Sequence, residues 1–341
     1  MVSCFIQIWS ILSLTKCQDK RGRVFGVANR PKQQAVAEWP TVLVIIGVYG
    51  AFAAITLSHR SVSAPVTIVG LAFVTAWQGS LQHELLHGHG LRSRLLREFF
   101  ARQALTIWLP FADYRNSHLR HHDDQYLTDP FDDPESTYRS GPEWQALPRP
   151  LRGILWVNRT LVGRVTVGPA IAMVRFFRTQ LDLLRNTATS RRIWAEHLVA
   201  VGAVLAWVVG VAHLPLWEFL LGSAYFGTSL TMVRSFAEHT WRPDVVERTA
   251  VVRSRGFWSL LFLNNNLHVT HHLRPDVPWF RLPALTDSLH ADEIAADGAG
   301  RFRGYRDVAW QFAFRPRCQP AFPADVGHLP LPRVRRIRQT A

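Results

Sequence analysis

Two long segments near the start of the chain contain no ionisable side chain. Residues 39–58 and residues 61–82 each lack Asp, Glu, Lys, Arg and His, and only His59 and Arg60 lie between them. About 20 apolar residues are enough for a helix to cross the hydrocarbon core of a bilayer. These segments therefore predict two membrane-spanning helices joined by a very short turn.

A second pair of apolar segments follows much later in the chain. Residues 197–212 and residues 216–235 are separated by a turn that contains Pro215, and up to Val233 only Glu218 interrupts the second segment. A proline between two apolar runs is typical of a turn. The sequence thus predicts an all-α integral membrane protein with four transmembrane helices in two hairpins.

Arginine is concentrated between and after the hairpins. The chain has 39 Lys and Arg against 25 Asp and Glu, a net charge of +14. Sixteen arginines lie in residues 83–192, whereas the two outer turns contain only Arg60. Because cations are enriched in cytoplasmic loops, we expect the central loop and both termini on the cytoplasmic side of an inner membrane. The positive charge then faces anionic lipid, and nucleic-acid binding is not expected.

Histidines form three short clusters. The sequences HELLH, HLRHH and HVTHH contain eight of the fifteen histidines: His83, His87, His118, His121, His122, His268, His271 and His272. Residues at i, i+3 and i+4 share one face of a helix, so each cluster predicts a face of imidazoles. All three clusters lie on the expected cytoplasmic side, in a helical cap, and can converge. His239 follows the fourth span at the same depth as His83 and is a ninth candidate.

Eight or nine imidazoles exceed the three or four ligands of one tetrahedral zinc ion. They favour a pair of first-row transition metals. Histidine ligands need neighbours that fix their tautomer, and the expected neighbours are Glu84, Asp113, Asn116, Asp123, Asp124, Glu238, Asn264, Asn265 and Asn266. For each acidic residue after the second cluster, a place in a solvated loop is the favoured alternative: Asp123, Asp124, Asp129, Asp132, Asp133 and Glu135.

The order of these clusters and hairpins resembles the membrane-bound fatty acid desaturase and hydroxylase superfamily. The segment NNNLHVTHHLRPDVPWFRLP, residues 264–283, is most similar to bacterial fatty acid desaturase-like proteins. The resemblance implies a desaturase-like domain over residues 39–290. Residues 1–38 are then expected to form an N-terminal cytoplasmic extension, and residues 291–341 a basic C-terminal cytoplasmic tail.

The resemblance also implies a function. It implies two non-haem iron ions held by the eight clustered histidines and His239, with O₂ as co-substrate. The reaction implied is oxidation of an unactivated C–H bond in a lipid chain that enters from the bilayer. Acyl desaturation is favoured, and hydroxylation or ketolation of an acyl, alkane or carotenoid substrate stays open.

Electrons for such a reaction are expected from a separate protein. The sequence contains no cytochrome b5 haem motif, no cysteine set for an iron–sulfur cluster and no G-x-G-x-x-G motif. We therefore expect a ferredoxin-type donor with its own reductase.

Two other interpretations of the histidines are weaker. HELLH is also the H-E-x-x-H helix of zinc proteases, but that interpretation leaves both H-x-x-H-H clusters unexplained. A metal transporter would carry ionisable ligands inside its spans, whereas the first two spans contain none.

Overall fold

The computed structural model describes residues 17–18, 24–25 and 38–323. It is mostly helical, as expected, and the chain divides into two units. In the unit made by residues 1–36 and 328–341, the short strands β1 (Cys17–Gln18) and β2 (Val24–Phe25) pair antiparallel. The other unit, residues 37–327, contains all remaining elements. Most of the predicted extension 1–38 and the end of the predicted tail lie outside the described residues.

The first predicted hairpin is present. Helix α1 (Trp39–Ser58) continues through a 3₁₀ turn at His59–Ser61 to helix α2 (Ala64–Leu86). The second helix begins later than expected because Pro65 occupies its first turn, the position that proline favours. It ends four residues later than expected, since Leu85 and Leu86 are buried in the core. Large apolar side chains are exposed along α1, which suits contact with lipid.

The second hairpin is longer and less regular than predicted. Helix α9 (Ala188–Leu205) begins nine residues before the predicted span and continues as a π-helical stretch, Ala206–Val211. The return segment consists of α10 (Leu216–Phe219), a π-helical stretch Leu220–Gly227, and α11 (Thr228–Glu238).

Three helices among the described residues are long and apolar enough to cross a membrane: Trp39–Ser61, Ala64–Leu86 and Ala188–Val211. The return segment from Leu216 to Glu238 is not one of them, because acidic and hydroxyl side chains lower its hydropathy. A fourth span therefore stays a prediction.

Small residues allow this return segment to pack closely on α2. A Cβ atom added to Gly222 would lie 2.9 Å from the carbonyl oxygen of Ile68 and 2.9 Å from Cβ of Leu71. Such contacts are too short for carbon. The close approach of the two helices therefore requires glycine at this position.

Gly222→Ala should destabilise the protein by about 1–3 kcal/mol, the usual cost of overpacking a core. Thermal unfolding of the detergent-solubilised protein measures this loss. Gly210→Ala is the matched control, because a Cβ atom at Gly210 meets nothing within 4 Å. Equal stability of the two variants would contradict the close packing.

The remaining elements form the cap. Between the hairpins lie α3 (Arg94–Ala101), α4 (Phe111–His121), a 3₁₀ turn (Asp124–Tyr126), α5 (Gly141–Ala146), α6 (Arg149–Val157), α7 (Leu161–Thr166) and α8 (Gly168–Asn186). After α11 come a 3₁₀ turn (Val245–Arg248), β3 (Val251–Val252), α12 (Phe257–Leu261), α13 (His268–Leu273), a 3₁₀ turn (Trp279–Arg281), α14 (Leu282–Ser288), α15 (Ala291–Asp297), β4 (Arg301–Phe302) and α16 (Tyr305–Phe312). Strands β3 and β4 pair in parallel.

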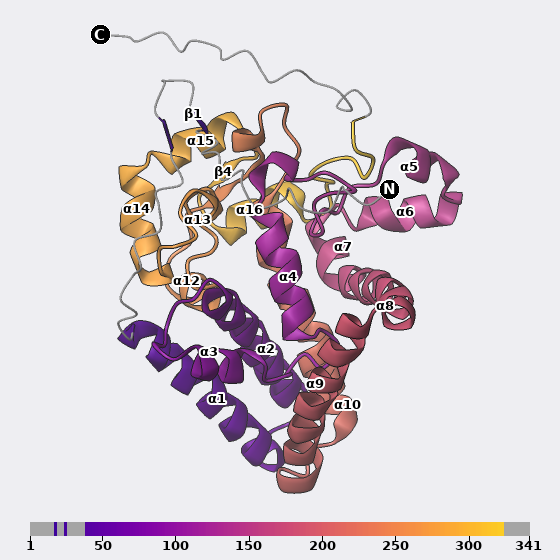
Figure 1. Ribbon diagram of the computed structural model, residues 1–341, viewed down its shortest axis with the longest axis vertical. Helices are drawn as coiled ribbons and strands as arrows, with labels where there is room; N and C mark the ends of the chain where they lie inside the picture. Colours follow the sequence, from indigo (N-terminus) through magenta and orange to yellow (C-terminus); the bar gives the residue numbers. More distant parts are fainter. Residues whose placement is uncertain (1–16, 19–23, 26–37, 324–341) are drawn as a thin grey trace, which may run out of the picture. The chain divides into compact units, whose positions relative to one another are not determined.

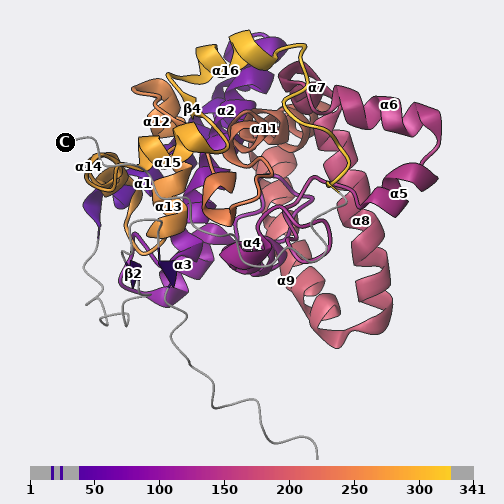
Figure 2. The ribbon, with the colours of Figure 1, turned by 90° about the horizontal axis from the view of Figure 1, so that it is seen from above.

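The cap lies at the end of the bundle away from the hairpin turns. Figure 1 shows the turns after α1 and α9 at its lower end, and α13, α14 and α15 at its upper end. Seen from above in Figure 2, α14 and α15 lie beside α13, and these three helices contact one another. The chain beyond residue 290 contributes to the core, because Ala291, Ala295 and Val308 are completely buried. The proposed boundary at residue 290 thus falls between two helices that pack together.

Candidate metal centre

The nine candidate histidines come from four parts of the chain and meet in the cap. His83 lies on the last turn of α2 and His87 directly follows that helix. The second cluster lies at the end of α4, and the third forms most of α13. His239 follows α11. The ligand atoms fall into two groups, each within 4.8 Å: His83, His87, His118, His122 and His271, and His121, His239, His268 and His272.

Each H-x-x-H-H cluster contributes to both groups. His118 and His122 belong to the group of five, whereas His121 belongs to the group of four. In the third cluster, His268 and His272, at positions i and i+4, belong to the group of four, and His271 belongs to the group of five. Around a helix, residue i+4 lies only about 40° to one side of residue i, whereas residue i+3 lies to the opposite side of residue i. The sequence prediction that each cluster points in one direction was therefore too simple.

The nitrogen atoms within each group are spaced as ligands of one ion. In the group of four, Nε2 of His239 lies 3.1 Å from Nε2 of His121 and 2.9 Å from Nε2 of His268. In the group of five, Nε2 of His122 lies 3.0 Å from Nε2 of His118 and of His271. Two imidazoles bound about 2.1 Å from one metal at a right angle would have nitrogens roughly 3.0 Å apart. Both groups thus fit a metal ion.

The protonation of the histidines also suits metal binding. Burial lowers the pKa well below its usual value in five of those outside the membrane-spanning helices: His87, His122, His239, His268 and His271. Their neutral imidazoles have a free lone pair, which a metal ligand requires. Nε2 of His87 is buried and has no hydrogen-bond partner among the described residues. An ion in the group of five would satisfy this nitrogen.

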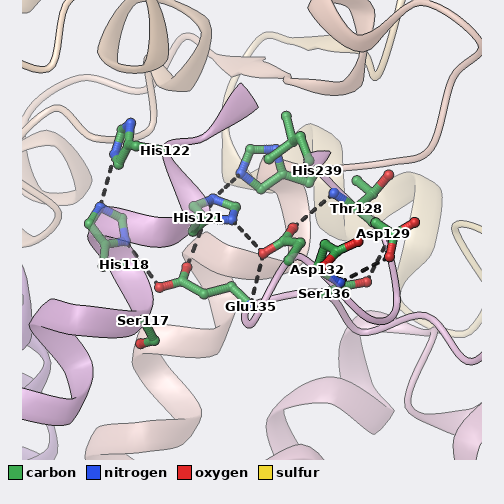
Figure 3. Close-up of polar contacts among 12 residues, drawn as sticks. Ser117, His118, His121, His122, Thr128, Asp129, Asp132, Glu135, Ser136 and His239 are labelled. Carbon is green, nitrogen blue, oxygen red and sulfur yellow. Dashed lines mark hydrogen bonds and ion pairs between the residues drawn. The ribbon is translucent and has the colours of Figure 1, made fainter. Parts of the chain in front are cut away.

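Glu135, in the loop between α4 and α5, lies close to one histidine of each group. Its carboxylate lies 3.0 Å from Nδ1 of His118 and 3.9 Å from Nε2 of His121, and Figure 3 shows it between the two rings. Although burial alone would raise the pKa of Glu135, the two histidines hold it well below its usual value. The side chain is therefore an anion that orients His118 through its Nδ1 atom and places a negative charge near Nε2 of His121.

Asp133 is a second carboxylate partner of His121. Its Oδ1 atom lies 2.9 Å from Nδ1 of His121, and its other oxygen accepts the backbone N–H of Thr128. Burial alone would lower the pKa of His121, but Glu135 and Asp133 raise it to about 9. Metal binding at this histidine would therefore release a proton.

Asn265 contacts both groups from the opposite side. Its amide oxygen lies 3.1 Å from Nδ1 of His268, and its amide nitrogen lies 3.2 Å from Nε2 of His83. Leu263 and Asn264 place it there by adopting left-handed backbone angles, with φ of 46° and 53°. Such angles are uncommon outside glycine, so this turn is a specialised feature of the site.

The structure changes the expected set of histidine partners. Asn265 and Glu238 contact His268, as predicted. Asn264 and Asn266 instead bond the backbone of Trp279 and Val252, and Asp123 is exposed. The side chain of Asp124 lies outside the described part of the chain. Asp133 and Glu135 were expected in a solvated loop, and their contacts with histidines correct that expectation.

Glu84 points away from the nine histidines. Its carboxylate accepts the backbone N–H of Trp279 and lies in a separate group with Glu38 and His89. His89 itself contacts Glu38 and the carbonyl oxygen of Pro275. The acidic residue of HELLH is thus engaged in a structural contact between the start of α1 and the segment after α13.

Comparison with known families agrees with the geometry. A family model described as fatty acid desaturase matches residues 58–304, more than two thirds of the chain. The matched region contains all nine histidines of the two groups. A search of curated proteins found no significant match.

Proposed function

The chain belongs to the fatty acid desaturase family, and we propose that it catalyses O₂-dependent oxidation of an unactivated C–H bond in a lipid chain. The observation that carries this proposal is the arrangement of nine histidines in two adjacent groups at the end of a helical bundle. Two groups of mostly buried imidazoles with carboxylate partners suit two iron ions. When bound, the iron ions would activate O₂, which is the oxidant of the reaction.

The protein's own residues would hold and orient the metals. In the proposed centre, His83, His87, His118, His122 and His271 bind one ion, and His121, His239, His268 and His272 bind the other. Glu135 and Asn265 each contact one histidine of both groups, so they fix the rings relative to each other. Most of these side chains are buried, which limits access of water to the site.

Membrane placement follows from the helices. We propose that α1, α2 and α9 cross an inner membrane, that the return segment from Leu216 to Glu238 is the fourth span, and that the histidines face the cytoplasm. A lipid chain could then reach the site from the bilayer. A separate ferredoxin-type protein and its reductase would supply electrons from the cytoplasmic side.

Acyl desaturation is the reaction that we propose first, and hydroxylation or ketolation is the alternative at the same site. Expression in a host of known lipid composition, followed by mass spectrometry of its lipids, distinguishes them. Loss of two hydrogens from a lipid indicates desaturation, and gain of one oxygen indicates hydroxylation. Lipids identical to those of a host carrying the empty vector would contradict the proposal.

Metal analysis of the purified protein tests the centre independently of turnover. We expect two iron ions per chain, one for each histidine group. One zinc ion per chain together with peptide cleavage would instead favour a protease. The position of Glu84 argues against that outcome, because a protease of the H-E-x-x-H type needs this carboxylate as its general base.

A further inference from the structure

A cavity of about 90 Å³ lies next to the candidate metal centre, with His239 and Glu135 among its lining residues. Its lining combines the loop around Glu135, the end of α11, the segment before α7 and the chain after α16. Three arginines line it: Arg159, Arg164 and Arg317. One water needs only roughly 10–15 Å³ of such space, so a small polyatomic group fits.

Arg164 is a buried cation that forms no ion pair with the carboxylates of the described residues. Its side chain lies on α7 and is 9% exposed, and its Nε atom has no hydrogen-bond partner among the described residues. Burial and the repulsion by Arg159 and, more weakly, by Arg317 lower the pKa of Arg164 to about 10, although Cys318 acts in the opposite direction. Arg164 therefore stays protonated at neutral pH. A buried charge without a partner is costly.

The other two arginines are held by neutral groups. Arg159 donates to the hydroxyl and the carbonyl oxygen of Thr137, at 2.6 and 2.8 Å. Arg317 donates to the carbonyl oxygens of Phe236 and Ala299, at 2.5 and 2.8 Å. These contacts fix the two guanidinium groups in place but do not neutralise their charge.

The carboxylates that also line the cavity are committed elsewhere. Asp133 and Glu135 bond histidines of the metal centre, as described above. Glu238 pairs with Arg234 at 2.7 Å. Three carboxylates and three arginines thus line the same cavity, but the contacts described pair none of these carboxylates with Arg159, Arg164 or Arg317.

We propose that Arg159, Arg164 and Arg317 form a binding site for an oxyanion, a phosphate or carboxylate group. The planar guanidinium fork matches the geometry of such groups and binds them through paired, charge-assisted hydrogen bonds. The anion is either a free ion or the head group of a lipid. It would bind whether or not the nearby histidines oxidise a lipid, because binding requires only charge and space.

Binding is tested with the full-length protein in a neutral detergent. In the first arm, inorganic phosphate replaces chloride stepwise at constant ionic strength. Two quantities are measured at each step: the unfolding temperature, and the rate at which maleimide labels Cys318, a residue that lines the cavity. We expect phosphate to raise the unfolding temperature saturably and to slow the labelling of Cys318. Hexadecyl phosphate provides the second arm. Half-saturation at a lower concentration of inorganic phosphate indicates a free anion as the ligand. Half-saturation at a lower concentration of hexadecyl phosphate indicates a lipid head group.

Arg164→Gln should raise the half-saturating concentration at least about tenfold, because one charge-assisted contact is lost. Arg164→Lys keeps the charge and should retain part of the binding, and Arg178→Gln, an exposed arginine on α8, should behave as wild type. Removal of a buried, unpaired charge should not lower the stability of Arg164→Gln without phosphate. Unchanged binding in Arg164→Gln, or no saturable effect of either probe on the wild type, would overturn the proposal.

Discussion

Alanine in place of His271 should leave the protein folded, remove the iron ion expected in the group of five and abolish oxidation of the lipid. His271 belongs to the group of five, and its Nε2 atom lies 3.0 Å from that of His122. Loss of a residue that merely orients a ligand typically costs roughly 10–100-fold in metal affinity or activity. Loss of the ligand itself should cost more. Iron content and lipid mass spectrometry measure the two effects.

The control for this variant is His290→Asn. His290 is exposed at the start of α15 and adopts a left-handed backbone with φ of 51°, which asparagine tolerates. The iron content and the activity of the His290→Asn variant should equal those of the wild type. Full activity of His271→Ala with an unchanged iron content would rule out His271 as a ligand. A variant that unfolds in detergent is identified by its thermal unfolding, and His271→Gln then replaces it.

The spans could be predicted because their signal is local. A run of apolar residues must avoid water wherever it lies, so composition alone located α1, α2 and the second half of α9. Their ends were less certain, because they depend on Pro65 in one case and on packing of Leu85 and Leu86 in another. The polar residues of the return segment leave its membrane placement as a prediction.

The centre was only partly predictable for a related reason. Repeated spacing placed His118, His121 and His122 on one helix end, but their division between two groups depends on how α4 and α13 face each other. Asp133 and Glu135 lie in a loop without any periodic pattern, so their path back to the histidines has no sequence signal. Their distance of little more than ten residues from His121 was the only hint.

The arginines show the same limit of sequence reasoning. Their number predicted a cytoplasmic face in contact with anionic lipid, and for many exposed arginines that remains the simplest interpretation. Arg159 and Arg164 are instead buried, and Arg317 joins them from a segment more than 150 residues away. Only the tertiary structure brings these three charges to one cavity.

Glu135→Gln should weaken iron binding at both histidine groups, by roughly 10–100-fold. Glutamine has nearly the same shape but no negative charge, so it holds Nδ1 of His118 less firmly than the carboxylate does and places no charge near Nε2 of His121. Because these histidines belong to different groups, one substitution should affect both ions. Titration of the metal-free protein with ferrous iron, followed by equilibrium dialysis, measures the two affinities.

Asp132→Asn is the matched control on the same loop. Its carboxylate is exposed and lies 3.7 Å from a guanidinium nitrogen of Arg120, and such surface pairs contribute at most about 1 kcal/mol to stability. Iron affinity should therefore stay at the wild-type value. If Glu135→Gln weakened the binding of only one of the two ions, Glu135 would act on a single histidine group. Wild-type affinity at both would show that the carboxylate does not position either histidine, and Asp133 would then be the remaining orienting partner of His121.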